Sequence, residues 1–280
     1  MTDDVHPGAV GPGGEPRWEI EDLRTGWRQA GVEPGMHVII HSALSSIGRV
    51  RGGAATVVSS LRRAVGPEGT LVTPAFTPQV ADPDPLVRGL PDESVRVRRD
   101  QVPLFTPQMS SPMGAVAEAL RLTPGAVRSW HPQVSVAALG ACAGDIVASQ
   151  PLQFAVGRGS PFERLRHVGG WILLVGVGHN RNSFLHHAES LIDRPRLKQR
   201  RFPVLVDGER IWWETLDVGD DNNTHFPVVG EDYERHAGIR PVQVGRARTV
   251  LLPAQDFVSF ASHRLAELID HERATASSSR

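Results

Sequence analysis

Short β-rich runs alternate with amphipathic helical segments near the start of the chain, and this alternation constrains the fold more than any other feature. Residues 18–31 and 52–66 place apolar side chains at helical spacing and each segment closes on a glycine. Residues 36–44 and 69–76 are short and β-rich. A strand–helix–strand rhythm of this kind packs helices against a parallel or mixed sheet, so the sequence predicts an α/β fold.

The alternation breaks at residues 77–112 and resumes afterwards. Prolines and charges dominate this segment, and a long irregular loop in a compact domain is often functional, so we expect a lid or a rim. Residues 170–178 predict a further buried strand. Residues 201–218 predict a hairpin, because two β-rich arms flank an Asp-Gly pair. A last amphipathic helix is expected over residues 254–272.

The 280-residue chain is long enough to bury a substantial core, and no clear linker divides it. We predict one α/β domain with insertions over residues 18–272, between a mobile N-terminal tail at residues 1–17 and a mobile C-terminal tail at residues 273–280. The N-terminal tail is acidic and rich in glycine and proline. It lacks the basic start and apolar centre of a secretion signal.

Charge and cysteine content argue against several classes of partner. With 30 Lys and Arg against 31 Asp and Glu, the net charge of −1 attracts neither nucleic acid nor an anionic membrane. No apolar run reaches the ~18 residues that a membrane span needs. The single cysteine cannot form an internal disulfide, which fits a cytoplasmic protein. A homodimer is compatible with these features.

The segment LLVGVGHNRNSFLHHAES runs from a buried strand through glycines into a helix that begins with two histidines and a glutamate. On that helix His186 and Glu189 are three residues apart, so their side chains leave the same face. His186 lies in the first turn, where the helix dipole disfavours imidazolium and keeps the ring neutral, as a general base requires. Ligands gather at the carboxyl ends of strands in open α/β sheets, and this helix starts there. The simpler alternative is that these residues lie on a helix face without a functional role.

The same segment also contains residue types that bind metals, namely His179, His186, His187 and Glu189. Adjacent histidines on a helix point about 100° apart, however. Zinc-binding histidine pairs on helices usually lie four residues apart, as in HExxH, and that motif is absent. We therefore expect no metal.

A second candidate segment, VIIHSALSSIGRVRGG, follows a strand end and opens a helix. Backbone amides at such a helix start can bind a phosphate or a carbonyl oxygen, although a structural turn is the simpler interpretation. The chain has neither the GxGxxG of dinucleotide-binding folds at this place nor a P-loop, and it has no GxSxG nucleophile elbow.

Other polar clusters become informative only in combination. RSWHPQVS contains Arg128 in a turn before a strand, and GRGSPFERL places Ser160 before a proline in a good arrangement for a helix start. Most charge runs are solvated surface, and the acidic ones that could line a site are Asp82 with Asp84, and Asp217 with Asp220 and Asp221.

Four segments together resemble the aminoglycoside 3-N-acetyltransferase family of antibiotic acetyltransferases, which is unrelated to the GNAT fold. They are VIIHSALSSIGRVRGGAATVVSSLRRAVGPEGTLVTPAF, MGAVAEALRLTPGAVRSWHPQVSVAALG, GRGSPFERL and LLVGVGHNRNSFLHHAE, in the family's order. The resemblance implies a three-layer α/β fold with a mixed sheet and helices on both faces. It implies acetyl-CoA as donor and the 3-amino group of a deoxystreptamine ring as acceptor, and hence antibiotic resistance.

The resemblance also implies site residues. The family's histidine and glutamate map onto His186 and Glu189, and its histidine and serine after the first strand map onto His41 and Ser42. On this basis we expect His186 to be the general base, oriented by Glu189, with His41 as the next candidate. The expected acetyl-CoA contacts are Ser42, Ser45, Ser46, Gly52, Gly53, Arg128 and Ser160.

A cationic acceptor predicts a cleft lined by carboxylates. The candidates are Asp220 and Asp221 first, and Asp82 and Asp84 second. Two residues depart from the family pattern: His187 stands where an apolar residue is usual, and His225 where an acid is commoner. We expect His187 to be a packing residue or a wall of the acceptor pocket.

Three alternatives to this function stay open at this stage. One is an acetyltransferase of the same fold that modifies a different amine. Another is a metal-dependent hydrolase that uses His179, His187 and Glu189. The last is a non-catalytic protein that binds a small molecule.

Overall fold

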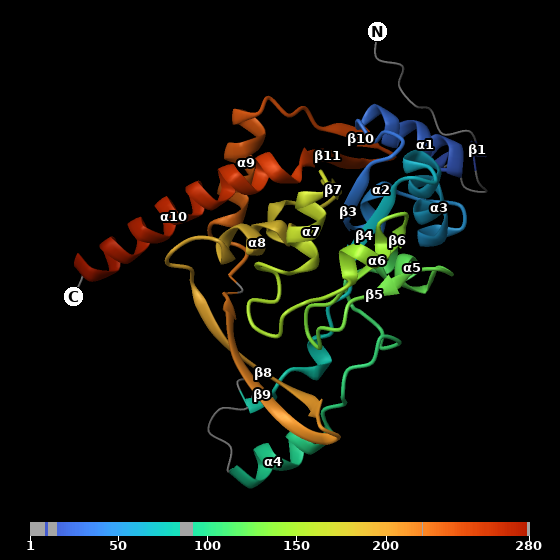
Figure 1. The fold of residues 1–280 in the computed structure, drawn as a ribbon. Helices are drawn as coiled ribbons and strands as arrows, with labels where there is room; N and C mark the ends of the chain where they lie inside the picture. Colours follow the sequence, from blue (N-terminus) through green and yellow to red (C-terminus); the bar gives the residue numbers. More distant parts are fainter. Residues whose placement is uncertain (1–8, 11–15, 85–91, 220, 279–280) are drawn as a thin grey trace.

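The computed structural model describes residues 9–10, 16–84, 92–219 and 221–278. At its centre is a seven-stranded sheet in which β3 runs parallel to both β4 and β7, whereas the outer pairs are antiparallel (Figure 1). The strand order is β10 (Val242–Val244), β11 (Ala247–Pro253), β7 (Trp171–Val175), β3 (His37–Ser42), β4 (Thr70–Pro74), β6 (Val136–Gly140) and β5 (Val127–Arg128). The predicted mixed sheet is confirmed.

Alternate residues of the central strands face two separate cores, because successive side chains of a strand point to opposite faces. In β7, Leu173 packs into one core and Leu174 into the other. With apolar side chains on both faces, the sheet needs a helical cover on each side.

The first helical layer contains α1 (Ile20–Gln29), α3 (Gly53–Val65) and α5 (Ala115–Leu122). The indole of Trp27 is fully buried there and donates a hydrogen bond of 2.8 Å to the hydroxyl of Ser60. This layer and the N-terminal half of the sheet form the strand–helix–strand unit that the sequence predicts.

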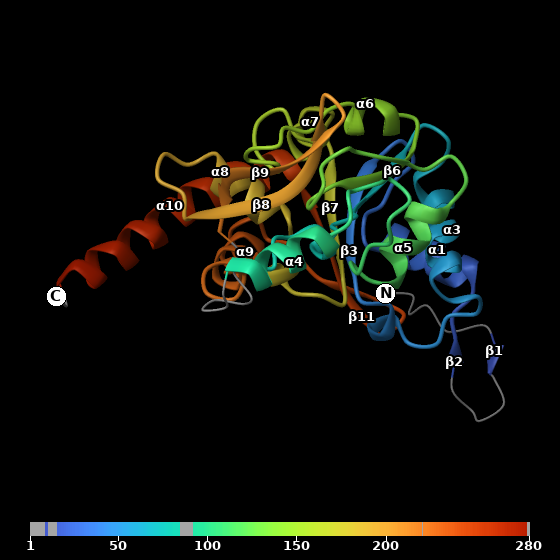
Figure 2. The ribbon, with the colours of Figure 1, turned by 90° about the horizontal axis from the view of Figure 1, so that it is seen from below.

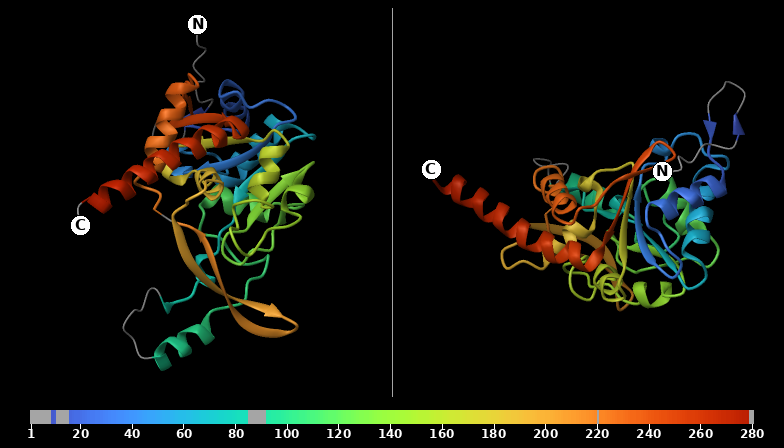
Figure 3. Two further views of the ribbon diagram at one scale, coloured as in Figure 1. Left: turned by 60° about the vertical axis from the view of Figure 1, so that its left-hand side comes forward. Right: turned by 90° about the horizontal axis from the view of Figure 1, so that it is seen from above.

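The second layer covers the opposite face, and Figure 3 shows the sheet between the two layers. Its core includes Phe162, Phe184 and Phe257, all fully buried. The predicted three-layer α/β fold is therefore confirmed. The helices of this layer are α6 (Ala143–Val147), α7 (Pro161–His167), α8 (Phe184–Ser190), α9 (Phe226–His236) and α10 (Ala254–Ser278).

The predicted hairpin is present as β8 (Leu197–Val206) and β9 (Glu209–Val218). Asp207 and Gly208 in its turn have φ angles of 52° and 84°, as the two central residues of a type I′ turn require. The hairpin extends away from the sheet, together with α4 (Figure 1).

The segment 77–112 is not wholly irregular, so the expectation of an irregular loop is wrong, whereas its role as a lid or rim stays a prediction. It contains the 3₁₀ helix η1 (Pro78–Val80) and the ten-residue α4 (Asp92–Gln101). Within α4 only Val95 is buried, so the helix carries no apolar stripe by which its period could be recognised.

The structure also contains elements that the sequence analysis did not assign. Residues 226–253 form α9, β10 and β11, and a short α2 (Leu44–Ile47) follows β3. The last helix continues beyond residue 272 to Ser278, and its end projects from the body (Figure 2).

Parts of the expected N-terminal tail pair as β1 (Ala9–Val10) and β2 (Pro16–Arg17). The rest of that tail, apart from these strands, lies outside the described residues. The domain limits at residues 18 and 272 stay a prediction. Across the described ranges, no helix combines the length and apolar character that a membrane crossing requires.

Candidate functional site

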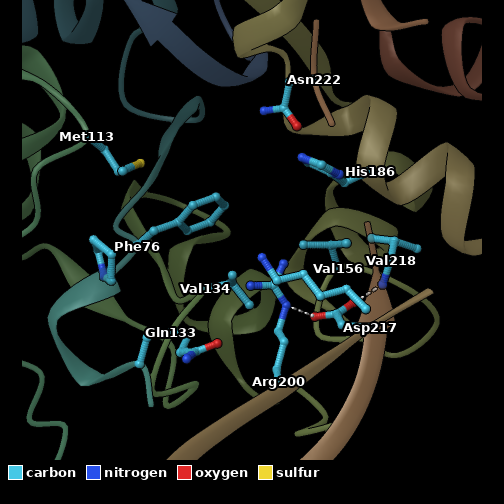
Figure 4. Close-up of a pocket in the computed structure, with 13 residues that line it drawn as sticks. Phe76, Met113, Gln133, Val134, Val156, His186, Arg200, Asp217, Val218 and Asn222 are labelled. Atoms are coloured by element: carbon cyan, nitrogen blue, oxygen red, sulfur yellow. Dashed lines mark hydrogen bonds and ion pairs between the residues drawn. The ribbon is translucent and has the colours of Figure 1, made fainter. Parts of the chain in front are cut away.

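A pocket of about 340 Å³ lies beside the carboxyl end of β4 and below the start of α8, where the hairpin approaches the body (Figure 4). Such an edge is where open α/β sheets bind ligands. The lining residues are Phe76, Pro78, Ala81, Met113, Gln133, Val134, Val156, His186, Lys198, Arg200, Asp217, Val218 and Asn222.

His186 is the residue predicted as general base that lines this pocket. Its ring is half-buried and packs edge-to-face against Phe226, with 4.7 Å between the ring centroids. Figure 4 shows the ring reaching from α8 toward the cavity. The location of His186 therefore suits a group that exchanges a proton with a bound molecule.

Two side chains hold the start of α8. The backbone N–H of Ser183 donates to Nε2 of His41 at 3.1 Å, and the N–H of Phe184 donates to the side-chain oxygen of Asn182 at 3.1 Å. These contacts satisfy donors that a helix N-terminus leaves without partners inside the helix. Burial, with a smaller contribution from His179, lowers the pKa of His41 to about 3, so the ring stays neutral and its Nε2 can accept.

A buried chain of polar contacts supports the same helix start from α9. Nε2 of His179 lies 3.0 Å from a carboxylate oxygen of Glu234, which also pairs with Arg248. The other ring nitrogen of His179 lies 3.5 Å from the side-chain amide of Asn182. Gly230 leaves the room for this ring, since a Cβ at that position would lie 1.8 Å from Cγ of His179.

Glu189, the predicted orienting residue, is fully buried and binds Arg196. Its oxygens accept from Nε of Arg196 at 2.7 Å and from Nη2 at 3.1 Å. The guanidinium of Arg196 lies over the ring of Phe226, 5.9 Å from its centroid, and that ring also contacts His186. Through these contacts Glu189 supports the surroundings of His186, and its catalytic role stays a prediction.

His187 lies behind the pocket wall. It is fully buried, and its Nδ1 donates to the carbonyl oxygen of Val156 at 2.6 Å. Its ring also packs against Phe162 and Phe184. Burial lowers the pKa of His187 to about 4, so the ring is neutral near pH 7. His187 thus packs in the core and fixes Val156, which does line the pocket.

The carboxylate that lines the pocket is Asp217, which the sequence analysis noted but did not select. Burial raises the pKa of Asp217, and Arg200 acts in the opposite direction with its Nε 3.2 Å from an oxygen of Asp217. The hairpin register could have identified Asp217 from the sequence. Asp217 is paired with Lys198, and both side chains lie on the face of the hairpin that lines the pocket.

The other predicted acidic residues lie elsewhere. Asp82 is buried and accepts from both Arg99 and Arg201, and Asp84 pairs with Arg201 at 3.0 Å. The Arg99 pair joins the segment before α4 to α4 itself, and the Arg201 pairs join it to the hairpin. Their predicted role in acceptor binding stays a prediction.

Asp221 is exposed and accepts hydrogen bonds from the backbone N–H groups of Asn223 and Thr224. Asp220 lies outside the described residues. Nε2 of His225, the second departure from the family pattern, lies 2.9 Å from a carboxylate oxygen of Glu272 and so links the start of α9 to α10.

The predicted acetyl-CoA residues near the sheet edge fall on two turns. Ser42 ends β3 and Ser45 lies in α2, while the hydroxyl of Ser46 donates to the carbonyl of Gly176 at 3.1 Å. Gly52 and Gly53 have φ angles of 80° and 62° where α3 begins. A hollow there is lined by Arg17, Arg49, Val50, Arg51 and Gly52.

Arg128 and Ser160 have structural partners. The buried guanidinium of Arg128 donates to the carbonyls of Ala75, Pro107 and Met109 and so ties the end of β4 to the loop before α5. Ser160 caps α7 by accepting from the N–H of Glu163, as predicted. Contact of either residue with acetyl-CoA stays a prediction.

The residues of the metal-dependent alternative have separate partners. His179 binds Glu234, His187 binds the carbonyl of Val156, and Glu189 binds Arg196. Within the described ranges no three His, Cys, Asp or Glu residues gather in a way that could hold a metal ion.

Comparison with known proteins gives one consistent family. A family model described as aminoglycoside 3-N-acetyltransferase matches residues 39–266. The chain is 36% identical over 261 residues to aminoglycoside N(3)-acetyltransferase VII of Streptomyces paromomycinus, which covers 87% of this chain and 90% of that protein. The crystal structure of the aminoglycoside acetyltransferase AAC(3)-Xa superposes with a TM-score of 0.82 at 34% identity, covering 90% of this chain and 94% of that one.

Two further similar structures contain ligands. AAC-IIIb, in a binary complex with CoASH, has a TM-score of 0.79 at 29% identity and covers 90% of this chain and 97% of that one. AAC-VIa bound to sisomicin has the same TM-score and identity and covers 89% of this chain and 97% of that one.

Proposed function

This chain belongs to the aminoglycoside 3-N-acetyltransferase family, and from that premise we propose that it transfers the acetyl group of acetyl-CoA to the 3-amino group of a deoxystreptamine aminoglycoside. The observation that carries the proposal is that His186 and the carboxylate of Asp217 line one pocket at the edge of the sheet. The CoASH and sisomicin complexes of two relatives support the choice of donor and acceptor.

We assign the role of general base to His186. An aminoglycoside amine is mostly ammonium at neutral pH, so it first loses one proton to solvent. As the nitrogen bonds to the thioester carbonyl carbon, His186 takes a second proton from it. When the carbon–sulfur bond breaks, the histidine returns this proton to the sulfur of CoA. The products are an amide and the CoA thiol, formed by direct transfer because the thioester is already activated.

Other groups of the site support this reaction. Donors between Ser42 and Ser46 are proposed to hold the oxyanion, a role whose loss typically costs ~10²–10³ in rate. Asp217 is proposed to bind a cationic group of the acceptor, because a buried carboxylate needs a compensating positive charge. Glu189 holds the wall behind His186 through Arg196.

The test is a comparison of His186→Ala and His186→Gln with the unaltered enzyme, read by thiol release from acetyl-CoA with sisomicin as acceptor. We expect kcat to fall by ~10²–10⁴ because general base catalysis contributes that much. The matched control is His263→Gln, at an exposed position on α10, which should keep normal turnover. Near-normal kcat in either His186 variant would refute the assignment and make His41 the next candidate.

Three broader expectations are also proposals. The enzyme is proposed to work in the cytoplasm, where a protein with one free cysteine, Cys142, stays reduced. It is proposed to act without nucleic acid, membrane or metal. A homodimer is its proposed oligomeric state, which sedimentation equilibrium would test.

A further inference from the structure

The pocket contains an arginine whose charge opposes that of the proposed acceptor. Arg200 and Asp217 both line it, and Figure 4 shows the guanidinium beside the carboxylate in the cavity. The Asp217 side chain is 2% exposed and that of Arg200 is 19% exposed, so the pair belongs to the pocket wall. Among the described lining residues, Asp217 is the one carboxylate, and Lys198 and Arg200 are cationic.

The register of the hairpin explains why these charges face inward. Lys198 lies directly opposite Asp217, and Arg200 opposite Thr215, so all four side chains share one face. Phe202 continues that face along β8 and is fully buried. Burial of Phe202 turns the face toward the body, and the charged residues beside it are thereby carried into the pocket.

We propose that Arg200 is a specificity-determining residue that occupies Asp217 in place of the acceptor's cationic group, an inference that rests on the proposed function of this pocket. A buried carboxylate needs a positive partner. Arg200 supplies it in the free protein, and an ammonium group of the acceptor replaces it in the complex.

The competition makes the pocket selective by charge. An acceptor binds only to the fraction of molecules in which Asp217 is available, so its apparent affinity is lowered by that fraction. Each additional positive charge that the acceptor brings to this end of the pocket is repelled by Arg200 and Lys198. The enzyme therefore favours acceptors that place one cationic group here over acceptors that place several.

Arg200→Gln tests the proposal, because glutamine keeps a polar side chain and removes the competing charge. We expect the Kd of sisomicin, measured by titration calorimetry without acetyl-CoA, to fall on the order of tenfold. The acceptor KM should fall with it, while kcat stays within about threefold. Arg63→Gln is the matched control, since it removes one positive charge from an exposed pair with Glu21 and should leave Kd unchanged. An unchanged or higher Kd in Arg200→Gln would overturn the proposal.

A double-mutant cycle separates competition for Asp217 from general repulsion. In an Asp217→Asn background, Arg200→Gln should improve the affinity for sisomicin by no more than about threefold, because only the repulsion of additional charges remains to be relieved. The same tenfold gain in both backgrounds would show that Asp217 is not the contested group. If Arg200→Gln does not fold, Arg200→Met, which suits the apolar part of the wall, repeats the measurement.

The proposed acetyl transfer and the competition of Arg200 for Asp217 can fail separately. If Arg200→Gln binds sisomicin more tightly but the unaltered enzyme releases no thiol with any aminoglycoside, the inference about the pocket stands and the proposed function falls. If the unaltered enzyme acetylates sisomicin and Arg200→Gln binds it no better, the function stands and the inference falls.

Discussion

At the scale of single residues, His187 shows how a departure from the family pattern can be structural. It adjoins His186 in sequence, yet its ring donates to the carbonyl of Val156 and packs in the core. Adjacent positions on a helix point about 100° apart, and this separation divides the two histidines between pocket and core. The sequence geometry therefore separated them correctly, but only the structure identified the partner of His187.

His187 should make stability depend on pH. Burial lowers its pKa from 6.5 to about 4, so between these values the unfolded chain binds more protons than the folded protein, and the free energy of unfolding rises with pH. His187→Leu removes that dependence and the hydrogen bond to Val156. Denaturant titrations should therefore show that His187→Leu has a lower unfolding free energy than the unaltered protein. The difference between the two proteins should be about 2 kcal/mol larger at about pH 7.5 than at about pH 5.

The control for this prediction is a buried neighbour that cannot titrate. Leu185 lies on the same helix and is fully buried. The loss of unfolding free energy in Leu185→Val should therefore be equal at both pH values. A deficit of His187→Leu that did not change between the two pH values would contradict the neutral, buried state of the ring.

At the scale of elements, α8 is a short helix whose position depends on its neighbours. Its first N–H groups bind His41 from β3 and Asn182, while Glu234 of α9 braces that turn through His179, which lies just before α8. Seven residues are too few for a helix that is stable alone. The position of His186 thus depends on contacts made by other elements.

Gly230→Ala tests this dependence from outside the pocket. The new Cβ would lie 1.8 Å from Cγ of His179, so the ring must move and the start of α8 loses its brace. We expect kcat to fall roughly tenfold to a hundredfold, as small misplacements of reacting groups do. The matched control is Gly144→Ala on α6, where a Cβ meets nothing within 4 Å. A kcat for Gly230→Ala within about twofold of normal would contradict the bracing role.

Elements with a regular apolar period could be predicted from the sequence, and those without one could not. The core-facing stripe of α3 and the turn of the β8–β9 hairpin both left local signals. α4 left none, because Val95 is its one buried residue among those described, and its end contacts the hairpin through the guanidinium of Arg99 over the ring of Trp212. No element was predicted in segment 226–253, although it contains β11, which pairs with β7 in the central sheet.

The same difference holds for the candidate site. The place of His186 in the pocket lining was predictable, because a helix start and the family resemblance select the same position. Asp217 was not selected, because an acidic residue in a run of acidic residues is typical of solvated surface. Only the register of the hairpin shows that its side chain faces the pocket. Arg196, the partner of Glu189, lies seven residues further along after the helix has ended, where no helical spacing predicts a contact.

At the scale of the whole molecule, ion pairs of Arg201 with Asp82 and Asp84 join the segment before α4 to the hairpin. Asp82 is almost fully buried between Arg99 and Arg201. Although burial acts to raise it, the pKa of Asp82 lies below its ordinary value because these guanidinium groups donate to the carboxylate. Pro78 and Ala81, just before Asp82, line the pocket, so this junction also sets the pocket wall.

Asp82→Asn should loosen this junction. We expect a loss of about 1–3 kcal/mol in unfolding free energy, because two guanidinium groups lose a charged partner. The acceptor KM should rise while kcat changes little, since the wall at Ala81 is displaced and His186 is not. Glu93→Gln, which breaks an exposed pair with Arg96 on α4, is the control and should change neither quantity. An unchanged acceptor KM in Asp82→Asn would show that the junction does not shape the pocket.

The central claim is that the pocket with His186 and Asp217 transfers an acetyl group from acetyl-CoA to the 3-amino nitrogen of an aminoglycoside. The most direct measurement follows CoA thiol release with sisomicin and locates the acetyl group on the product by NMR. The account predicts one thiol released for each acetyl group on the 3-amino nitrogen, with the rate of His186→Ala lower by ~10²–10⁴ under the same conditions. Acetylation at another nitrogen, or an undiminished rate in His186→Ala, would contradict it.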